Sequence, residues 1–338
     1  MNVAILNTDP LTCNYGGVAP IMKNLDPFLQ KAFNIKYFYV PEKKKKGLIP
    51  RRFQILWLLW RKRKELSQFD FIISHIPEGS YIASYCNVPY AHIYHGNDNP
   101  MSVSRYWYGK YFAKVYDRFY KRIARTATLK YTVGHTWGDV KKLFNPILHD
   151  VKPTPVESRT GFIFAGRLEE GKHIDRIIRI YAKMPAEIRE IHHFYIAGYG
   201  SQEQTLKELV HQLNLEDKIH FTGGLSNKEL ITEDSKRKIL LMASEKEGLP
   251  NVIAEAFSVG VPVVSTNAGD ISRVLKSGYN GYLLPLEFTD EEYIEAIKKV
   301  LTNYEELATN ALKSSVVFNA QTIAESLIDD INKYCKNN

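Results

Sequence analysis

Two carboxylates, Glu247 and Glu255, stand eight residues apart in the stretch S-E-K-E-G-L-P-N-V-I-A-E-A-F-S-V-G, residues 244–260. Apolar segments on both sides predict a strand before the stretch and another after it. Pro250 suits the first turn of a helix, because its missing N–H has no partner there. Glu247 is then expected in the loop before the helix and Glu255 about a turn and a half inside it. Both can face one crevice at the carboxyl end of a parallel sheet, where ligands bind.

The start of that helix is expected to bind an anion, because the N–H groups of Leu249, Asn251 and Val252 have no partner within the helix. The plain alternative is a surface loop with one acid and a helix with the second acid on its solvated face. The spacing of two acids does not by itself separate these readings.

A second candidate site follows the predicted strand Phe162–Ala165, in the segment F-A-G-R-L-E-E-G-K. Gly166 allows close approach, Arg167 can place two N–H groups on two phosphate oxygens, and Lys172 supplies a compact charge. Such a set suits a diphosphate. Taken alone, it is equally typical of a solvated turn.

Two more strand ends carry candidate ligand-binding residues. Gly16 and Gly17 lie between a predicted strand and a predicted helix, where glycine lets backbone N–H groups approach a ligand closely. A tight turn without a ligand is the alternative. His95 directly follows the predicted strand Tyr90–Tyr94 and precedes Gly96, a position that is typical of binding sites and not of cores.

These residues must be positioned by a repeating strand–helix order, which predicts βαβ units and parallel sheets in an α/β fold. The strands are expected at Val3–Leu6, Ile35–Val40, Phe71–His75, Tyr90–Tyr94, Lys130–Val133, Phe162–Ala165, Phe194–Ala197, Ile219–Thr222, Ile239–Met242, Val261–Ser265 and Gly281–Leu284. The clearest helices are expected at Val18–Lys31, Phe53–Leu66, Tyr106–Arg125 and Ala320–Tyr334. The polar segment 150–160, with two prolines, separates two Rossmann-like domains, residues 1–150 and 151–319.

The string E-G-L-P-N-V-I-A-E-A and the G-R-x4-K around Arg167 closely resemble motifs of glycosyltransferase family 4, which are retaining sugar transferases of the GT-B fold. The resemblance is strong from Gly161 to Leu284; in the first half it rests on Gly16-Gly17 and His95-Gly96. It implies two Rossmann-like domains facing across an active-site cleft. It also implies that residues 320–338 pack back on the first domain.

The resemblance also implies roles for single residues. Arg167 and Lys172 would bind the pyrophosphate of a nucleotide sugar and stabilise the departing phosphate, Glu247 would hydrogen-bond the donor sugar, and Glu255 the ribose. His95 would contact the sugar or phosphate beside the reacting centre. The implied donor-binding residues are Gly16, Gly17, Gly166, Arg167, Lys172, Phe221, Glu247, Gly248, Leu249, Pro250, Asn251 and Glu255.

At three positions the sequence supports the family's site residues less specifically or departs from the family's motifs. Phe221 resembles a strand end that contacts the nucleobase, yet core packing would select the same residue. His173 stands where the family usually has a small residue, and Tyr199 replaces an aspartate in a Gly-Asp-Gly turn. No D-x-D metal motif occurs, so Arg167, Lys172 and the helix start are expected to neutralise the leaving group without a metal or other cofactor.

Composition adds information about partners. Residues 1–150 hold 23 Lys and Arg against 10 Asp and Glu, whereas residues 151–338 hold 22 against 27, so the net charge of +8 comes from the first half. Such a basic half predicts an anionic partner. Three scattered cysteines, no leader-like start and no long apolar segment predict a cytoplasmic protein, peripheral on the inner face of the cell membrane.

The basic charge is concentrated in residues 43–64, which hold ten Lys and Arg and no acid. Phe53, Leu56, Trp57 and Trp60 form one helical stripe between them. This pattern favours an interfacial helix on anionic lipid; the alternative is that the stripe packs on the sheet and the charges are solvated. The predicted membrane surface comprises Arg51, Arg52, Trp57, Trp60, Arg61, Lys62, Arg63 and Lys64, and nucleic acid is not expected as a partner.

The expected reaction moves a hexose from a nucleotide diphosphate sugar, with UDP favoured, to a saccharide or lipid-linked acceptor in cell-surface glycan synthesis. Two alternatives stay open. A nucleotide-sugar epimerase shares the GT-B fold and would isomerise the donor without an acceptor. A non-catalytic nucleotide-sugar-binding protein would have less need of Arg167, Lys172, Glu247 and Glu255 together. The sequence does not predict the oligomeric state.

Overall fold

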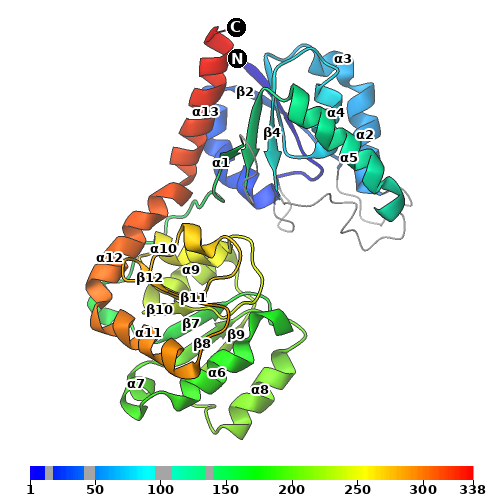
Figure 1. Ribbon diagram of the computed structural model, residues 1–338. Helices are drawn as coiled ribbons and strands as arrows, with labels where there is room; N and C mark the ends of the chain where they lie inside the picture. The colour runs from blue at the N-terminus through cyan, green and yellow to red at the C-terminus, as the bar shows by residue number, and fades with distance from the viewer. Residues whose placement is uncertain (12–17, 42–49, 96–108, 134–139, 338) are drawn as a thin grey trace. The chain divides into compact units, whose positions relative to one another are not determined.

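The computed structural model describes residues 1–11, 18–41, 50–95, 109–133 and 140–337 (Figure 1). The chain forms two compact units, Met1–Pro146 with Ala320–Asn338, and Ile147–Asn319. The second unit starts at Ile147 and not at residue 151, because Ile147 forms a bridge with Asn319 and its N–H donates to the Phe318 carbonyl oxygen. Parts of several predicted features lie outside the described residues: Gly16, Gly17, Gly96, residues 43–46 and Tyr106.

The first unit is built on a parallel sheet with strand order β2-β1-β3-β4-β5-β6. Its strands are β1 (Asn2–Leu6), β2 (Asn34–Phe38), β3 (Phe71–Ser74), β4 (Tyr90–Tyr94), β5 (Leu129–Thr132) and β6 (Lys141–Lys142). The five predicted strands of this half are present within two residues at each end. The short strand β6 was not predicted, because two lysines carry no apolar alternation.

Helices cover both faces of this sheet: α1 (Val18–Ala32), α2 (Arg51–Arg61), α3 (Arg63–Leu66), α4 (Pro77–Ala83), α5 (Gly109–Thr126) and α13 (Ala320–Asn337). Strand β1 contributes to the cores on both faces of the sheet, because successive side chains of a strand point to opposite faces. Val3 and Ile5 join the core under α1 and α13, whereas Ala4 and Leu6 join the core under α2, α4 and α5. The single predicted helix Phe53–Leu66 is two helices, since Lys62 leaves helical geometry with ψ near 4°.

The C-terminal helix α13 belongs to the first unit, where it lies beside α1 (Figure 1). Ile323, Leu327 and Ile331 are buried in the core that it shares with β1 and β3. Asp330 on α13 accepts hydrogen bonds from the Tyr131 hydroxyl (2.8 Å) and from Lys141 Nζ (2.6 Å). The apolar face of α13 and the two hydrogen bonds to Asp330 therefore hold the end of the chain against the first sheet.

The second unit has a parallel sheet with strand order β12-β11-β10-β7-β8-β9. Its strands are β7 (Phe162–Ala165), β8 (Phe194–Ala197), β9 (Ile219–Gly223), β10 (Ile239–Leu241), β11 (Val263–Thr266) and β12 (Gly281–Leu284). The chain moves outward from β7 to β9 on one side and from β10 to β12 on the other. The loops that follow β7 and β10 therefore diverge and leave a crevice at the carboxyl edge, which is the usual ligand position in such sheets.

The second unit carries helices α6 (Ile174–Lys183), α7 (Ala186–Ile191), α8 (Glu203–Gln212), α9 (Asn227–Lys236), α10 (Asn251–Ser258), α11 (Asp290–Thr302) and α12 (Tyr304–Ser314). Capping boxes start α9 at Ser226 and α11 at Thr289, each with a glutamate three residues later. Helix α10 begins at Asn251 with Pro250 as its N-cap, so Leu249 lies outside the helix start to which it was assigned.

Candidate functional site

The loops after β7 and β10, which are 75 residues apart in sequence, are joined by an ion pair between Lys172 Nζ and Glu247 Oε1. A backbone hydrogen bond from Glu245 N–H to the Gly171 carbonyl oxygen (3.1 Å) supports the same junction. The Lys172 and Glu247 side chains are 21% and 12% exposed, so each is shielded yet reachable. The two residues predicted from separate motifs thus lie together at the point where the strand order reverses.

A cavity of about 400 Å³ opens over this junction. Its lining comes from the two loops alone: Arg167, Glu169, Gly171, Lys172, Glu245, Lys246, Glu247 and Gly248. Arg167 is exposed, and α10 begins three residues after Gly248. Cations, an acid and a helix N-terminus around one space can hold a ligand that carries both phosphate and hydroxyl groups.

Gly269, in the loop after β11, supports Glu247 from behind. Its φ is +59°, and a Cβ placed there would lie 1.9 Å from the Glu247 carbonyl oxygen. The next residue, Asp270, donates its N–H to the Gly248 carbonyl oxygen at 3.0 Å. The turn after β11 therefore sets the position of the Glu247 loop.

Replacement of Gly269 by Ala is expected to push the Glu247 loop outward and to destabilise the second unit. Gly278 is the matched control, because its φ is +75° but a Cβ there would have no heavy atom within 4 Å. We expect Gly278→Ala to cost about 1 kcal/mol of backbone strain and Gly269→Ala clearly more. Thermal unfolding and amide hydrogen exchange of residues 244–250 measure both effects; equal behaviour of the two variants would contradict the assignment.

Glu255 does not share the cavity with Glu247, as the prediction of one crevice required. Glu255 is only 5% exposed. It lies about a turn and a half into α10, within the segment Ile253–Phe257 that is buried on all sides. One carboxylate oxygen accepts a hydrogen bond from Asn227 Nδ2, and Oε2 has no partner among the described residues. Burial raises the pKa of Glu255 to about 7. Burial, and next to it the Glu255 charge, also raise the pKa of buried Asp234.

Two further predicted ligand-binding residues, Phe221 and His95, are not among those that line this cavity. Phe221, on β9, is half-buried against the core of the second unit, and Lys207 Nζ lies 5.6 Å from its ring centroid. His95 directly follows β4 in the first unit, and its Nε2 lies 2.9 Å from Nδ1 of His75. His75 follows β3 as His95 follows β4, but no motif in the sequence marks it as a site residue.

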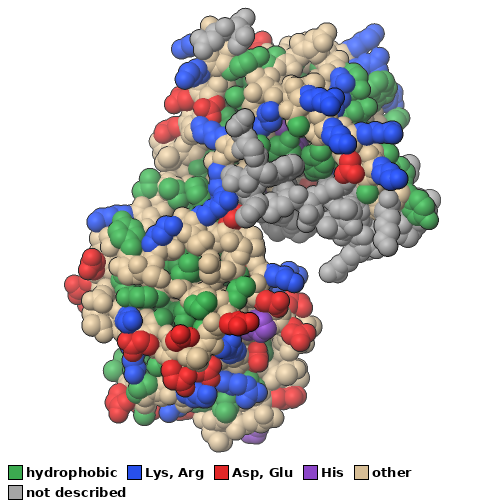
Figure 2. Space-filling view, viewed as in Figure 1, with side chains coloured by type: hydrophobic (Ala, Val, Ile, Leu, Met, Phe, Trp, Pro, Cys, Tyr) green, Lys and Arg blue, Asp and Glu red, His purple; other side chains and the backbone are tan. Residues whose placement is uncertain are grey.

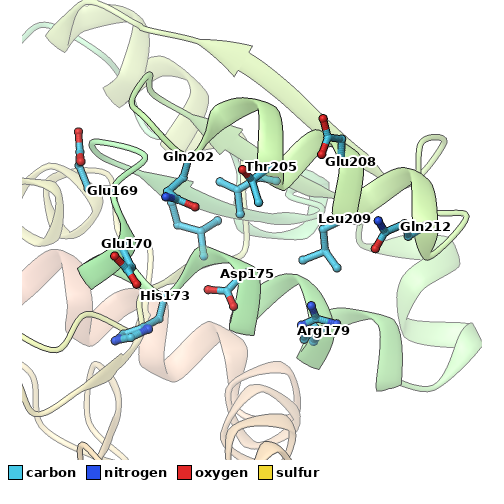
Figure 3. Close-up of a pocket in the computed structure, with 12 residues that line it drawn as sticks. Glu169, Glu170, His173, Asp175, Arg179, Gln202, Thr205, Glu208, Leu209 and Gln212 are labelled. Atoms are coloured by element: carbon cyan, nitrogen blue, oxygen red, sulfur yellow. The ribbon is translucent and has the colours of Figure 1, made fainter.

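A second cavity of about 430 Å³ lies between α6 and α8 (Figure 3). Four carboxylates line it, from Glu169, Glu170, Asp175 and Glu208. The basic residues of the lining are fewer: Arg179 and His173. A diphosphate would be repelled there, so the cavity between the Lys172 and Glu247 loops is the candidate site.

The predicted membrane surface divides into two parts. Trp57 and Trp60 are 62% and 48% exposed, while Ile55 and Leu59 of the same helix enter the core. The Arg61 and Arg63 guanidinium groups stack on the Trp57 and Trp60 rings, 4.7 and 4.5 Å from the centroids. Lys62 and Lys64 are exposed beside them. Figure 2 shows Lys and Arg side chains gathered over the first unit.

Arg51 and Arg52 are a correction to that surface. Arg51 pairs with Asp9 (2.7 Å) and donates to the Val40 carbonyl oxygen (2.7 Å). Arg52 Nη1 donates at 2.9 Å to Glu78, which is fully buried. Both guanidinium groups are turned toward protein partners, because α2 is anchored at its N-terminal end and only its C-terminal end and α3 project charge into solvent.

Comparison with known proteins identifies the second unit. Residues 149–314 match the family model described as "Glycosyl transferases group 1". Residues 149–314 belong to this family. The resemblance to glycosyltransferase family 4 inferred from the motifs around Arg167 and Glu247 is thereby confirmed.

Two curated relatives match part of the chain. The N-acetyl-alpha-D-glucosaminyl L-malate synthase of Bacillus anthracis is 30% identical over 46% of this chain and 39% of its own length. A Campylobacter jejuni N-acetyl-D-galactosaminyltransferase, whose name gives a PP-undecaprenol glycan as acceptor, is 25% identical over 58% of this chain and 50% of its own. The chain thus matches half or less of the length of these relatives.

Solved structures of the same fold cover the whole chain. The Anabaena protein HepE in complex with UDP aligns with a TM-score of 0.70 over 98% of this chain and 100% of that chain, at 17% identity. The predicted α/β fold, two Rossmann-like domains of the GT-B type, is confirmed by this match together with the two parallel sheets.

Two kinds of feature are absent from the described residues. Among these residues, no three or more His, Cys, Asp or Glu side chains are grouped to hold a metal ion. No helix in the same ranges has both the length and the apolarity that crossing a bilayer requires.

Proposed function

We propose that the protein is a retaining glycosyltransferase that moves a hexose from a nucleotide diphosphate sugar to a saccharide or lipid-linked acceptor in cell-surface glycan synthesis. The observation that carries the proposal is the Lys172–Glu247 ion pair across the point of strand reversal, beneath a cavity of about 400 Å³. Family membership supports a sugar-transfer reaction over other uses of a Rossmann-like site.

In this proposal the ion pair positions the Lys172 and Glu247 side chains for the donor. The β-phosphate takes the place of the Glu247 carboxylate on Lys172, and Arg167 binds the other phosphate oxygens with two N–H groups. The released Glu247 accepts hydrogen bonds from the hydroxyls of the donor sugar. Gly166, Gly248, Leu249 and Pro250 allow the backbone to approach the ligand, and Asn251 begins the helix whose positive end faces negative charge.

Lys172 and Arg167 then stabilise the charge that develops on the leaving diphosphate, and the proposal needs no metal for this step. Glu255 is proposed to bind the ribose through its unpaired Oε2. This requires a small opening beside Asn227, because the oxygen is buried. Phe221 is proposed to contact the base, Gly16 and Gly17 to approach the phosphates, and His95 to hydrogen-bond the donor.

A thermal-shift screen with UDP, GDP, ADP and their sugars tests the donor class. Binding to the native state alone raises the melting temperature, by an amount that corresponds to about 2.7 kcal/mol at a ligand concentration of 100 Kd. We expect one nucleoside diphosphate series to stabilise the protein. UDP is the first candidate, because the HepE structure of the same fold holds UDP. No shift with any nucleotide would contradict the proposal.

We also propose that the first unit rests on an anionic membrane surface through Trp57, Trp60, Arg61, Lys62, Arg63 and Lys64. Exposed tryptophans beside arginine and lysine suit the headgroup region of a bilayer. The surface would bring the protein to a lipid-linked acceptor, the kind named for the Campylobacter jejuni relative. A peripheral position on the inner face of the cell membrane follows from this proposal.

Exchange of Arg61, Lys62, Arg63 and Lys64 for Gln is expected to weaken binding to phosphatidylglycerol vesicles by roughly a thousandfold at low salt, since four charges at about 1 kcal/mol each contribute about 4 kcal/mol. Vesicle co-sedimentation measures the change. Gln at the exposed residues Lys152 and Lys298 of the second unit is the control. Unchanged binding of the fourfold variant, or no binding of the native protein, would exclude this surface.

A further inference from the structure

His75 and His95 form a pair at the carboxyl edge of the first sheet. They directly follow β3 and β4, which are parallel neighbours. Their ring centroids lie 5.1 Å apart with 29° between the planes, and His75 Nδ1 lies 2.9 Å from His95 Nε2. The His75 backbone is fixed as well, because its N–H donates to the Leu6 carbonyl oxygen at the end of β1 (3.0 Å).

Both rings are neutral near pH 7. Burial lowers the pKa of His95 to about 4. Burial, together with the neighbouring His95 and His92, also lowers the pKa of His75 well below its ordinary value. His92, the other titratable group beside the pair, is itself held by Ser80 Oγ at 2.7 Å. A hydrogen bond between two neutral imidazoles needs one N–H and one bare nitrogen.

The direction of this hydrogen bond follows from the surroundings of the other ring nitrogen of His75, Nε2. His75 Nε2 is buried and has no hydrogen-bond partner among the described residues. A buried N–H without an acceptor is rarer and less favourable than a buried lone pair without a donor. The proton of His75 therefore belongs on Nδ1, where it is donated to His95 Nε2.

We propose that His75 is a positioning residue that fixes His95 as its Nδ1–H tautomer. His95 Nε2 is then occupied as an acceptor, and Nδ1–H is the atom left to face a ligand. The inference rests on the proposed function and deepens it: His95 donates a hydrogen bond to a sugar or phosphate oxygen of the donor, and it does not take a proton from the acceptor.

Long-range proton–nitrogen NMR spectra of the ¹⁵N-labelled full chain test the tautomer without any substrate. We expect two neutral rings from pH 6 to 8, with His95 protonated at Nδ1; a spectrum lacking one ring in His95→Gln provides the assignment. A proton on His95 Nε2 would overturn the proposal. Since no nucleotide is present, this outcome is independent of whether the protein transfers sugar.

Variants at His75 separate positioning from bulk packing. The Asn side chain places an N–H near the position of Nδ1, whereas Phe keeps the ring and removes the donor. We expect His75→Asn to preserve the His95 tautomer and most of kcat, and His75→Phe to release Nε2 and lower kcat roughly 10- to 100-fold. Tryptophan fluorescence confirms folding of each variant. Equal kcat and equal His95 spectra for Phe and native protein would refute the role.

Discussion

Replacement of Lys172 by Met is expected to lower the rate of sugar transfer by roughly 10²- to 10³-fold, the usual effect of removing one group that stabilises developing charge on a leaving oxygen. The Met side chain keeps most of the packing and removes the cation. It also leaves the Glu247 carboxylate, 12% exposed, without its partner and next to the incoming diphosphate. Both effects act against the same step.

Steady-state kinetics with the donor found by screening measure this loss. Lys298→Met is the matched control, because Lys298 is an exposed lysine on α11 in the same unit. The double variant Lys172→Met/Glu247→Gln should bind nucleotide better than Lys172→Met alone, since the repelling charge is gone. It should still transfer sugar slowly. Normal transfer by Lys172→Met would remove Lys172 from the site.

Replacement of Arg52 by Met is expected to destabilise the first unit by about 3 kcal/mol, toward the low end for a broken buried ion pair because Arg52 is partly exposed. Glu78 is fully buried on α4 and, among the described residues, would keep only the Tyr116 hydroxyl as donor. Burial raises the pKa of the Tyr116 hydroxyl, and the neighbouring Glu78 charge raises it further. The cluster therefore joins α2, α4 and α5 in one buried polar contact.

Tryptophan fluorescence during denaturant unfolding measures this change in the first unit selectively, because all four tryptophans precede residue 147. Arg61→Met is the control, since Arg61 is exposed and contacts only the Trp57 ring among the described residues. Adding Glu78→Gln to Arg52→Met should recover part of the stability, because the buried charge is removed. Equal midpoints for Arg52→Met and Arg61→Met would disprove the buried pair.

Strand periodicity predicted most of this fold. Buried parallel strands read as short apolar runs, so the strands before Arg167 and before Glu247 could be found, and their carboxyl ends gave the positions of both loops. Helix boundaries were less predictable. The break at Lys62 depends on local geometry in a segment whose residues all favour helix, and α4 is too short to show a period.

The partners of charged residues could not be predicted, because they are long-range contacts. Arg52 and Glu78 are 26 residues apart, and no feature of the sequence around either residue indicates that the two side chains meet. Glu255 was expected at the crevice because its helical position suggested it, yet nearly the whole circumference of α10 is buried. Apolar residues on one face of a helix can be read from spacing, but complete burial depends on the helices that pack around it.

The central claim is that the loops after β7 and β10 form a diphosphate site governed by Lys172. Calorimetric titration of UDP, GDP and ADP into the native chain, Lys172→Met and Lys298→Met tests it most directly. We predict that one nucleotide binds the native chain and Lys298→Met with equal affinity at one site. Lys172→Met should bind it at least about tenfold more weakly, a loss of about 1.4 kcal/mol. Equal affinity for all three proteins, or no binding of any nucleotide, would contradict the claim.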